Sequence, residues 1–437
     1  MNSAGAGRRP NPEQAYLLWL DSLAKACWVA EPGTELTPVA DALGRVTASP
    51  VIARWPSPRS DCSAMDGIAV SAAAVSGQAP VRLTAGVFEW IDTGDPMPGG
   101  ADAVLMREWL LPQEDGSVVI AGGTDVTVTG AAMLTPGKHV RRAGEDFAAG
   151  EVLVPAGRRL RPGDLAAAAA GGHGSVPVAR RPVVAIIPTG DEIRSAGSML
   201  RRGDIIDTNS LMLAARCREL GALPVVSDVQ PDDPDVLAAE TRHAARRADL
   251  VLVIAGSSRG RDDHTGAVLA QVGGVAVTGV AVRPGHPALL GHVKRSSAGR
   301  AGIAPVIGLP GYPLATAVIF ELFAAPLLAA AGGMAESESV RTTLLATLDR
   351  DWSSPPGVEE WILVTVTSAP RELAVATPAR RGAGSISQLA RADAWWRVHA
   401  DQVDFAVGDT IEVVALTSKS VIIPLDRHAD DRKRAHD

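Results

Sequence analysis

The second half of the chain alternates short apolar runs with segments of helical character, and this rhythm constrains the fold more than any other feature. The strands are expected at residues 182–188, 223–227, 249–254 and 305–309, and the helices after them at about 208–220, 234–247, 265–271 and 314–328. Strand and helix alternation of this kind predicts a parallel α/β sheet. In such a sheet the carboxyl ends of the strands meet at one edge, where ligands bind.

Polar, glycine-rich segments follow these four strands. They are Thr189-Gly190-Asp191-Glu192, Asp232-Asp233, residues 255–265 and Pro310-Gly311-Tyr312-Pro313. Backbone N–H groups in such loops bind anions, and carboxylates at the same rim bind a divalent cation. Each segment alone also has a plain structural explanation, as a turn or a helix cap. Because four successive strand ends converge on one crevice, we expect an anionic ligand there.

The rest of the chain has a different pattern of predicted secondary structure. A helix is predicted from Pro12 to about Trp28, with Asn11 as its cap, and a second short helix at 41–46. Short apolar runs at 81–83, 103–106, 117–120 and 126–128 indicate a small β unit, and an alanine-rich helix is expected at 162–170. A further β region is predicted from runs at 340–348, 361–366, 373–376, 410–416 and 421–424.

Composition excludes several classes of protein. With 42 Lys+Arg against 49 Asp+Glu, the net charge of −7 and the absence of a basic block argue against nucleic-acid binding. Three scattered cysteines form neither a disulfide framework nor a zinc ribbon, so we expect a reduced, cytoplasmic protein. The most apolar stretch, 314–331, contains Glu321 and Pro326, and we expect a core helix rather than a membrane span. Nor does the N-terminus resemble a secretory signal.

Three segments of the β unit and its flank carry clustered charge. They are Asp61-Cys-Ser-Ala-Met-Asp66-Gly67, Thr93-Gly94, and Arg141-Arg-Ala-Gly-Glu-Asp146. Two aspartates among small residues suit a metal or substrate loop, although Asp66-Gly67 also suits an ordinary hairpin turn. The last segment also suits a solvated charge run. No Walker loop, Gly-x-Gly-x-x-Gly or Gly-x-Ser-x-Gly motif occurs, which argues against kinase, dinucleotide oxidoreductase and serine hydrolase functions.

The order of these motifs resembles the molybdopterin molybdenumtransferase (MoeA) family, which is related to the E domain of gephyrin. Further matching segments are Pro98-Gly-Gly-Ala-Asp-Ala-Val104, Asp207-Thr-Asn209, Arg283-Pro-Gly-His-Pro287 and Arg381-Gly-Ala-Gly384. The resemblance spans about residues 12–420 and rests on the combined order of the motifs.

The resemblance implies an elongated, multidomain α/β plus β architecture. A discontinuous linker domain would comprise residues 11–53 and 141–176, with an inserted β domain at 54–140. A molybdopterin-binding α/β domain similar to the adenylyltransferase MogA would follow at 177–332, then a C-terminal β-barrel-like domain at 335–425 and a disordered tail at 426–437. The family forms homodimers whose cleft lies between the α/β domain of one subunit and the first two domains of the other.

The resemblance further implies insertion of molybdate into adenylated molybdopterin, with Mg²⁺-dependent release of AMP. It gives catalytic roles to Asp66, Glu192, Asp232 and Asp263, the last three also as metal ligands. Implied substrate contacts are Thr93, Gly94, Asp146, Thr189, Gly190, Asp191, Gly256, Ser257, Ser258, Arg283, Gly285, Pro310, Gly311 and Pro313. A molybdopterin adenylyltransferase and client molybdoenzymes are the implied protein partners.

The chain departs from the family pattern at its anion-binding positions. Tyr312 replaces the usual Asn of Pro-Gly-Asn-Pro, His286 replaces a Lys, and Gly279 stands where a further cation is common. Arg283 stands where Lys is common, and Arg259 and Arg261 offer compensating charge. The retained carboxylates favour the transferase. The departures favour a divergent pterin-binding carrier. A scaffold, which the resemblance to gephyrin would allow, is the third and last alternative.

Overall fold

The computed structural model describes residues 9–30, 32–75, 81–120, 134–255, 264–295, 302–335, 342–367 and 373–416. The chain divides into two compact units. We call Thr34–Val178 the insert unit, and Met1–Gly33 together with Ala179–Asp437 the main unit.

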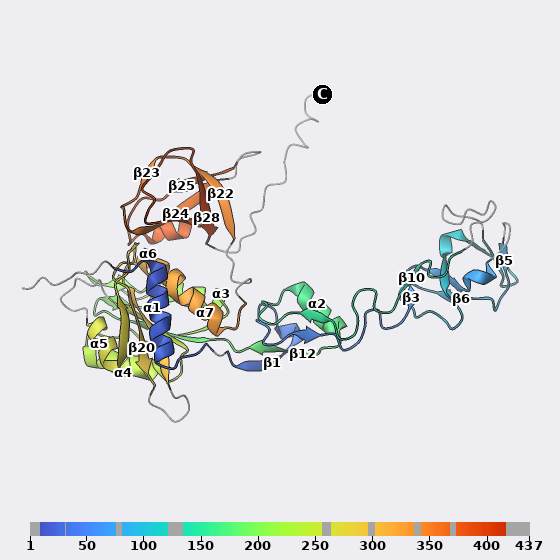
Figure 1. The fold of residues 1–437 in the computed structure, drawn as a ribbon, viewed down its shortest axis with the longest axis horizontal. Coiled ribbons are helices and arrows are strands. Elements are labelled where there is room, and N and C mark those ends of the chain that lie inside the picture. The colour runs from blue at the N-terminus through green and yellow to red at the C-terminus, as the bar shows by residue number, and fades with distance from the viewer. Residues whose placement is uncertain are drawn as a thin grey trace, which may run out of the picture. The chain divides into compact units, whose positions relative to one another are not determined.

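A six-stranded sheet forms the centre of the main unit, with the order β16-β13-β17-β21-β20-β18 (Figure 1). Its strands are β13 (Val183–Pro188), β16 (Leu223–Val226), β17 (Leu250–Ala255), β18 (Gly273–Thr278), β20 (Leu289–Lys294) and β21 (Ile303–Pro310). The first four in this order are parallel, which confirms the four predicted strands. Strands β20 and β18 extend the sheet in antiparallel fashion and lie outside the predicted pattern. No helix connects β18 to β20, so the strand and helix rhythm does not reveal them.

Alternate residues of the central strands enter two separate cores, as the two-residue period of a strand requires. Val184 and Ile186 pack with helices α1 and α3 on one face, whereas Ala185 and Ile187 pack with α4 and α5 on the other. The four helices are α1 (Pro12–Lys25), α3 (Asn209–Glu219), α4 (Pro234–Ala245) and α5 (Thr265–Val272). Both faces of the sheet are therefore covered, and its strand ends remain as the edge available to ligands.

Helix α1 begins as predicted. The Asn11 side chain accepts a hydrogen bond from the Gln14 N–H at 2.8 Å, and the Gln14 side chain accepts one from the Asn11 N–H. The helix ends at Lys25 rather than near Trp28, because Cys27 adopts a positive φ of 61°. Trp19 is fully buried and donates its indole N–H to the Gly291 carbonyl of β20. The N-terminal helix is thus part of the main unit's core.

The long apolar helical segment contains α6 (Pro313–Ile319), a π-helical turn η4 (Phe320–Ala324) and α7 (Ala325–Ala331). Pro313–Ala331 is long and apolar enough to cross a membrane, but 67% of its most apolar 18-residue stretch is buried inside the protein. Glu321 in the π turn accepts a 2.7 Å bond from Arg216 of α3. The segment is a core helix, as expected.

The C-terminal part of the main unit is a closed five-stranded barrel. Its strands are β22 (Thr343–Leu348), β24 (Glu359–Thr367), β25 (Ala374–Pro378), β26 (Ala394–Val398) and β28 (Thr410–Ala415), with the short strands β23 (Trp352–Ser353) and β27 (Asp404–Phe405) and helix α8 (Ile386–Arg391) beside it. Pairing of β24 with β26 closes the ring. Strand β19 (Val282–Arg283), from the α/β part, pairs with β24 and joins the two parts. The predicted strand at 421–424 lies outside the described residues.

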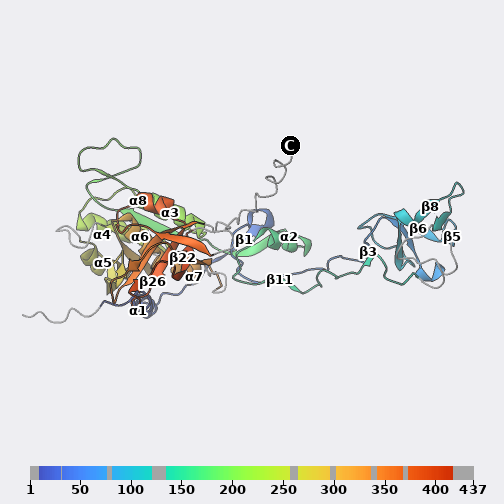
Figure 2. The same ribbon diagram turned by 90° about the horizontal axis from the view of Figure 1, so that it is seen from above.

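The insert unit contains short ladders and two three-stranded sheets (Figure 2). The ladders are β1 (Thr34–Pro38) with β12 (Ser175–Ala179), β2 (Val51–Ile52) with β11 (Val152–Val154), and β3 (Cys62–Ser63) with β10 (Val140–Arg141). One sheet comprises β4 (Gly67–Val70), β6 (Phe88–Ile91) and β7 (Ala103–Met106), and the other β5 (Val81–Leu83), β8 (Leu110–Pro112) and β9 (Val118–Ile120). Short 3₁₀ turns occur at η2 (Ala72–Ala74) and η3 (Arg107–Trp109). The predicted strand at 126–128 lies outside the described residues.

The helix expected at 41–46 is wrong. A 3₁₀ turn, η1 (Val39–Asp41), takes its place, and the chain leaves it through Gly44 at a φ of 72°. That conformation favours glycine and is incompatible with a continuing helix.

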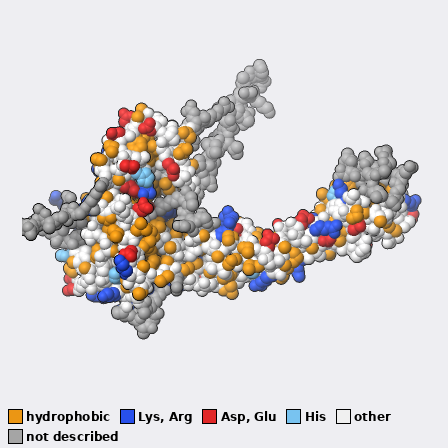
Figure 3. Space-filling view, viewed as in Figure 1, with side chains coloured by type: hydrophobic (Ala, Val, Ile, Leu, Met, Phe, Trp, Pro, Cys, Tyr) orange, Lys and Arg blue, Asp and Glu red, His pale blue; other side chains and the backbone are white. Residues whose placement is uncertain are grey.

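On the coloured surface of the described residues in Figure 3, basic and acidic side chains are interspersed without a continuous basic stripe in that view.

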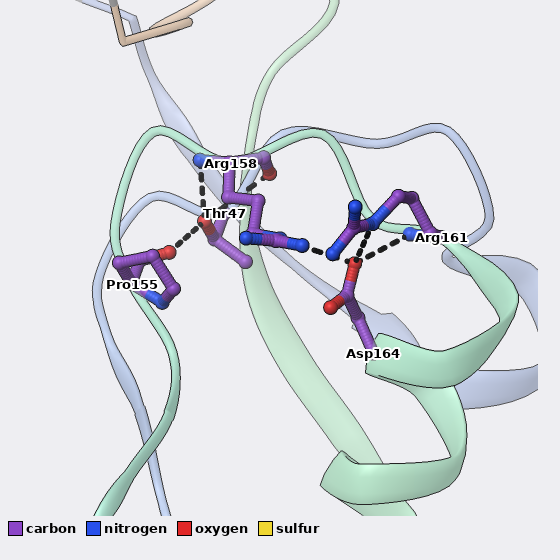
Figure 4. Close-up of polar contacts among 5 residues, drawn as sticks. All are labelled: Thr47, Pro155, Arg158, Arg161 and Asp164. Atoms are coloured by element: carbon purple, nitrogen blue, oxygen red, sulfur yellow. Dashed lines mark hydrogen bonds and ion pairs between the residues drawn. The ribbon is translucent and has the colours of Figure 1, made fainter. Parts of the chain in front are cut away.

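Helix α2 (Pro162–Ala170) is held at its start by Asp164 (Figure 4). The Asp164 carboxylate accepts the Arg161 N–H at 2.8 Å and the Nε atoms of Arg158 and Arg161 at 3.3 Å. Beside it, the Thr47 hydroxyl donates to the Pro155 carbonyl at 2.7 Å and accepts the Arg158 N–H. The two Thr47 bonds connect segments more than 100 residues apart, whereas the Asp164 bonds are local.

We predict that Asp164→Ala weakens α2 by about 1–2 kcal/mol, because the helix loses an N-terminal cap and a charged acceptor. Hydrogen exchange of the α2 amides, read by mass spectrometry, measures this directly. Substitution of the exposed Glu114 by Ala is the control. Equal exchange of α2 in the two variants would contradict the role given to Asp164.

Candidate functional site

A cavity of about 400 Å³ lies at the carboxyl ends of β13 and β17 in the main unit. Its polar wall includes Thr189, Glu192, Asp207 and Asn209, and we call it the strand-end cavity. The parallel register brings Pro188 opposite Ile254, so the segments that follow both strands start at the same edge. The position predicted from the strand order is therefore where the cavity is found.

The turn after β13 is fixed by hydrogen bonds to two neighbouring segments. The Thr189 hydroxyl donates to the Ile254 carbonyl at 2.8 Å, and the Gly190 N–H donates to the Gln230 carbonyl at 3.1 Å. Gly190 has a φ of 133°, and a Cβ there would lie 2.7 Å from Ile193 and 2.9 Å from the Glu192 carboxylate. Only glycine fits this position, and its absence of a side chain lets Glu192 fold back over the turn.

Asp191 and Asp232 are neighbours through two long backbone contacts. The backbone N–H of Asp191 lies 3.4 Å from the Asp232 carboxylate, and the N–H of Asp232 lies 3.4 Å from the Asp191 carboxylate. Glu192 is exposed at the cavity wall. Asp233 has a different role, since it caps α4 by accepting the N–H groups of Asp235 and Val236. The structural explanation thus holds for Asp233, whereas Glu192 lines the strand-end cavity and Asp191 and Asp232, which contact each other, are not among the residues of its wall.

The donor set of this rim fits Mg²⁺. Carboxylate oxygens are the ligands that this hard cation prefers, and it commonly takes one or two of them together with substrate phosphates. Among the residues that the structure describes, no group of three or more acidic, histidine or cysteine side chains is arranged to hold a metal ion. A cation bound here would therefore need a ligand's oxygens as well as the protein's.

The start of α3 forms the opposite wall. Asp207 accepts the Ser210 N–H at 2.9 Å, and the Asn209 amide donates to the Gly311 carbonyl at 2.7 Å. This bond ties the loop after β21 to α3. The Asn209 Oδ1 and Ser210 Oγ atoms are buried and lack a hydrogen-bond partner in the described structure. Unpaired buried polar atoms are costly, and of these two residues Asn209 lines the strand-end cavity.

A second cavity of about 450 Å³ lies between the α/β part and the barrel, and we call it the arginine cavity. Its cationic wall consists of Arg283, Arg380 and Arg381, with Trp352 and Glu360 beside them. Gly285 lies in this wall at a φ of 117°, where a Cβ would lie 2.8 Å from Ile319.

Glu360, only 2% exposed, organises the arginine cavity. It accepts hydrogen bonds from Arg381 at 2.8 and 3.0 Å and from the Ser354 hydroxyl at 2.7 Å. Burial raises the pKa of Glu360, but the bonds from Arg381 and Ser354 outweigh burial and the net shift is downward. Arg381 also stacks over Trp352 at 4.3 Å from the ring centroid. Its charge is thus largely satisfied within the protein.

Arg283 lies farther from Glu360 than Arg381 does and is more exposed. Its Nε lies 3.9 Å from the Glu360 carboxylate, and its side chain is 54% exposed. The guanidinium therefore retains donors that face solvent in the cavity. Arg283 is therefore better placed than Arg381 to meet an anionic ligand.

The insert unit carries the remaining predicted residues. Asp66 accepts both the backbone N–H and the hydroxyl of Thr93 at 2.7 Å. The Thr93 N–H is the main cause that lowers the pKa of Asp66, followed by the Thr93 hydroxyl. Gly94 follows at a φ of 94°. Asp146 is exposed, and its backbone N–H donates to the Ser57 carbonyl.

The structure places seven of the predicted α/β site residues in the walls of two cavities, whereas Gly190, Asp191 and Asp232 line neither. Thr189, Glu192, Gly311 and Pro313 line the strand-end cavity, while Arg283, Gly285 and Pro310 line the arginine cavity. Gly256, Ser257, Ser258 and Asp263 lie outside the described residues. Asn209, Glu360 and Trp352 were absent from the predicted site. Asn209 belongs to a matching motif, but no sequence pattern marks the other two.

Together, the fold and the site define a multidomain protein whose α/β domain presents acidic and cationic cavities at the ends of its parallel strands. Three family models match the chain. They are the MoeA N-terminal region (domain I and II) over residues 12–172, a probable molybdopterin binding domain over 185–330, and the MoeA C-terminal region (domain IV) over 346–416.

Whole-chain comparisons agree. The chain is 33% identical over 406 residues to Molybdopterin molybdenumtransferase 2 of Mycobacterium tuberculosis, covering 87% of this chain and 94% of that protein. It is 28% identical to the Molybdopterin molybdenumtransferase of Bacillus subtilis, covering 92% and 94%. The crystal structure of a molybdopterin biosynthesis MoeA protein from Pyrococcus horikoshii matches with a TM-score of 0.76 at 28% identity, covering 94% of this chain and 99% of that one. This chain belongs to the MoeA family.

We predict that Thr93→Val raises the pKa of Asp66 toward its ordinary value, because the ionised carboxylate loses the hydroxyl donor while the backbone donor remains. Carbon-13 NMR titration of the aspartate carboxyls in the full chain measures the shift, with Asp66→Asn to assign the resonance. Thr93→Ser keeps the hydroxyl and should keep the low pKa. Identical titrations of the Val and Ser variants would refute the assignment.

Proposed function

We propose that this protein is a molybdopterin molybdenumtransferase, which inserts molybdate into adenylated molybdopterin with Mg²⁺-dependent release of AMP. The observation that carries the proposal is the pair of adjoining cavities, one with a carboxylate rim and the other with an exposed arginine. A phosphoanhydride with its cation suits the first, and an oxyanion suits the second. The similarity to transferases over most of the chain supports the same reaction.

Glu192 and Asp232 are the described residues that would hold Mg²⁺, with Asp263 as a further proposed ligand and Asp191 as a proposed substrate contact. A Mg²⁺ ion held there would supply charge neutralisation on the phosphates, which would favour departure of AMP. The chain's own groups position the substrate. The Thr189 turn fixes Glu192, and the Asn209 bond to Gly311 holds the loop after β21 at the cavity.

Arg283 is the proposed molybdate ligand. Its exposed guanidinium offers charge-assisted hydrogen bonds. Glu360 holds the nearby Arg381 by a hydrogen bond, but its single negative charge does not neutralise all of the cavity's positive charge. The remaining proposed substrate contacts in the α/β part are Gly190, Gly256, Ser257, Ser258, Gly285, Pro310, Gly311 and Pro313.

The proposed assembly is a cytoplasmic homodimer in which Asp66, Thr93, Gly94 and Asp146 of a second copy complete the substrate site. The proposed domains keep the boundaries given above, with the linker at 11–53 and 141–176, the inserted β domain at 54–140, the α/β domain at 177–332 and the barrel domain at 335–425. A molybdopterin adenylyltransferase and client molybdoenzymes are the proposed partners.

A pterin-binding carrier that does not insert the metal is the second candidate. Tyr312 and His286, which replace an Asn and a Lys of the family pattern, favour it. Incubation of the purified protein with adenylated molybdopterin, Mg²⁺ and molybdate decides between the two. AMP release that requires molybdate supports the transferase, whereas tight pterin binding without AMP release supports the carrier.

We predict that Glu192→Gln slows AMP release at limiting Mg²⁺ by at least about tenfold, because the rim loses a carboxylate ligand. The fold and pterin binding should persist, since Glu192 is exposed. Glu412→Gln, an exposed substitution on β28, is the control. Unchanged Mg²⁺ dependence in Glu192→Gln would exclude it as a ligand.

We predict that Arg283→Gln raises the KM for molybdate by about tenfold, the loss expected for one charge-assisted hydrogen bond. The measurement is AMP release as a function of molybdate concentration. Arg391→Gln removes an exposed charge at the end of α8 and should leave the KM unchanged. A KM in Arg283→Gln equal to that of the parent protein would remove Arg283 from the molybdate site.

A further inference from the structure

Tyr312 is the one described residue that lies in the wall of both cavities. The strand-end cavity supplies acidic and amide groups on one side of it, and the arginine cavity supplies cations on the other. A ligand that extends from the carboxylate rim to Arg283 must therefore pass this side chain.

The backbone at Tyr312 is held from three sides. Its carbonyl accepts the Thr316 N–H at 2.9 Å and the Thr316 hydroxyl at 3.1 Å, at the start of α6. On the preceding residue, the Gly311 carbonyl accepts the Asn209 amide, and two residues later the Leu314 N–H donates to the Ala383 carbonyl. The loop that carries the ring is thus anchored to α3, to α6 and to the segment before α8.

The ring itself is only partly covered. Tyr312 is 58% exposed, and Gly384 lies beside its ring, where a Cβ on that glycine would lie 3.4 Å from Cδ1 and 3.7 Å from Cε1. An aromatic ring supported on a glycine backbone, with more than half of its surface open between two cavities, presents a flat face to whatever fills them. Stacking with another planar ring is the interaction that such a face favours.

We propose that Tyr312 is a specificity-determining residue, whose ring stacks against a planar heterocycle of the substrate where the two cavities meet. This inference rests on the proposed function, since the transferase substrate contains two heterocycles, a pterin and an adenine. Both rings have the chemistry that stacks on tyrosine, and binding of each part alone shows which of them uses this face.

The test uses the purified full chain and two probes, AMP and pterin-6-carboxylate. Binding is followed by calorimetry for both and by quenching of pterin fluorescence for the second. We expect Tyr312→Leu, which keeps an apolar side chain without the aromatic face, to bind one of the probes about tenfold more weakly. Tyr312→Phe, which keeps the ring, should retain most of that affinity. Leu345→Ala, an exposed substitution on β22, is the control.

Equal binding of both probes by the parent protein and Tyr312→Leu would overturn the proposal. Weak binding by Tyr312→Phe equal to that of Tyr312→Leu would also overturn it, because the hydroxyl rather than the ring would then be responsible. With adenylated molybdopterin, Tyr312→Leu should raise KM more than it lowers kcat. AMP release by the parent protein tests the transferase separately, so failure of the stacking proposal is distinguishable from failure of the proposed function.

Discussion

The parallel pairing of β13, β17 and β21 is the constraint on which the rest of the site depends. Register places Pro188 beside Ile254, and Ala255 beside Pro310, so the three strands end level with one another. The polar segments that follow them therefore emerge at one edge. The Thr189 hydroxyl, bonded to the Ile254 carbonyl, then fixes the first turn against the neighbouring strand. Without this level edge, Glu192 and Gly311 would not share a cavity wall.

The barrel makes a second contribution that the α/β domain alone cannot make. Strand β19 pairs with β24, and this pairing sets Arg283 beside the buried Glu360. A buried carboxylate without a partner would be strongly destabilising, and Arg381 and Ser354 supply the bonds that it needs. Because Arg381 donates its hydrogen bonds to Glu360, the more exposed Arg283 is the one of the two whose donors are available to a ligand. The arginine cavity therefore requires both parts of the main unit.

The sequence predicts the helices and strands better than it predicts the tertiary contacts between them. Apolar runs identify the four parallel strands because buried strands need continuous hydrophobic residues, and Asn11 with Gln14 identifies the start of α1. Glu360 and Arg381 are 21 residues apart on separate segments, and no local pattern indicates their ion pair. The substitution at Tyr312 is visible in the sequence as a departure from the family. Its place in the walls of two cavities is visible only in three dimensions.

Two cavities, rather than the single crevice expected from strand order, also suit the chemistry of the proposed reaction. A divalent cation requires carboxylates, whereas an oxyanion requires cations, and the two sets would neutralise each other if they lay in direct contact. Here Glu192 lines the cavity at the strand ends, Arg283 lines the cavity at the barrel junction, and Tyr312 lines both. Separation by a polar but uncharged aromatic side chain lets each set keep its charge for the ligand. The departure at Tyr312 thus falls at the position where the two electrostatic environments must be kept apart.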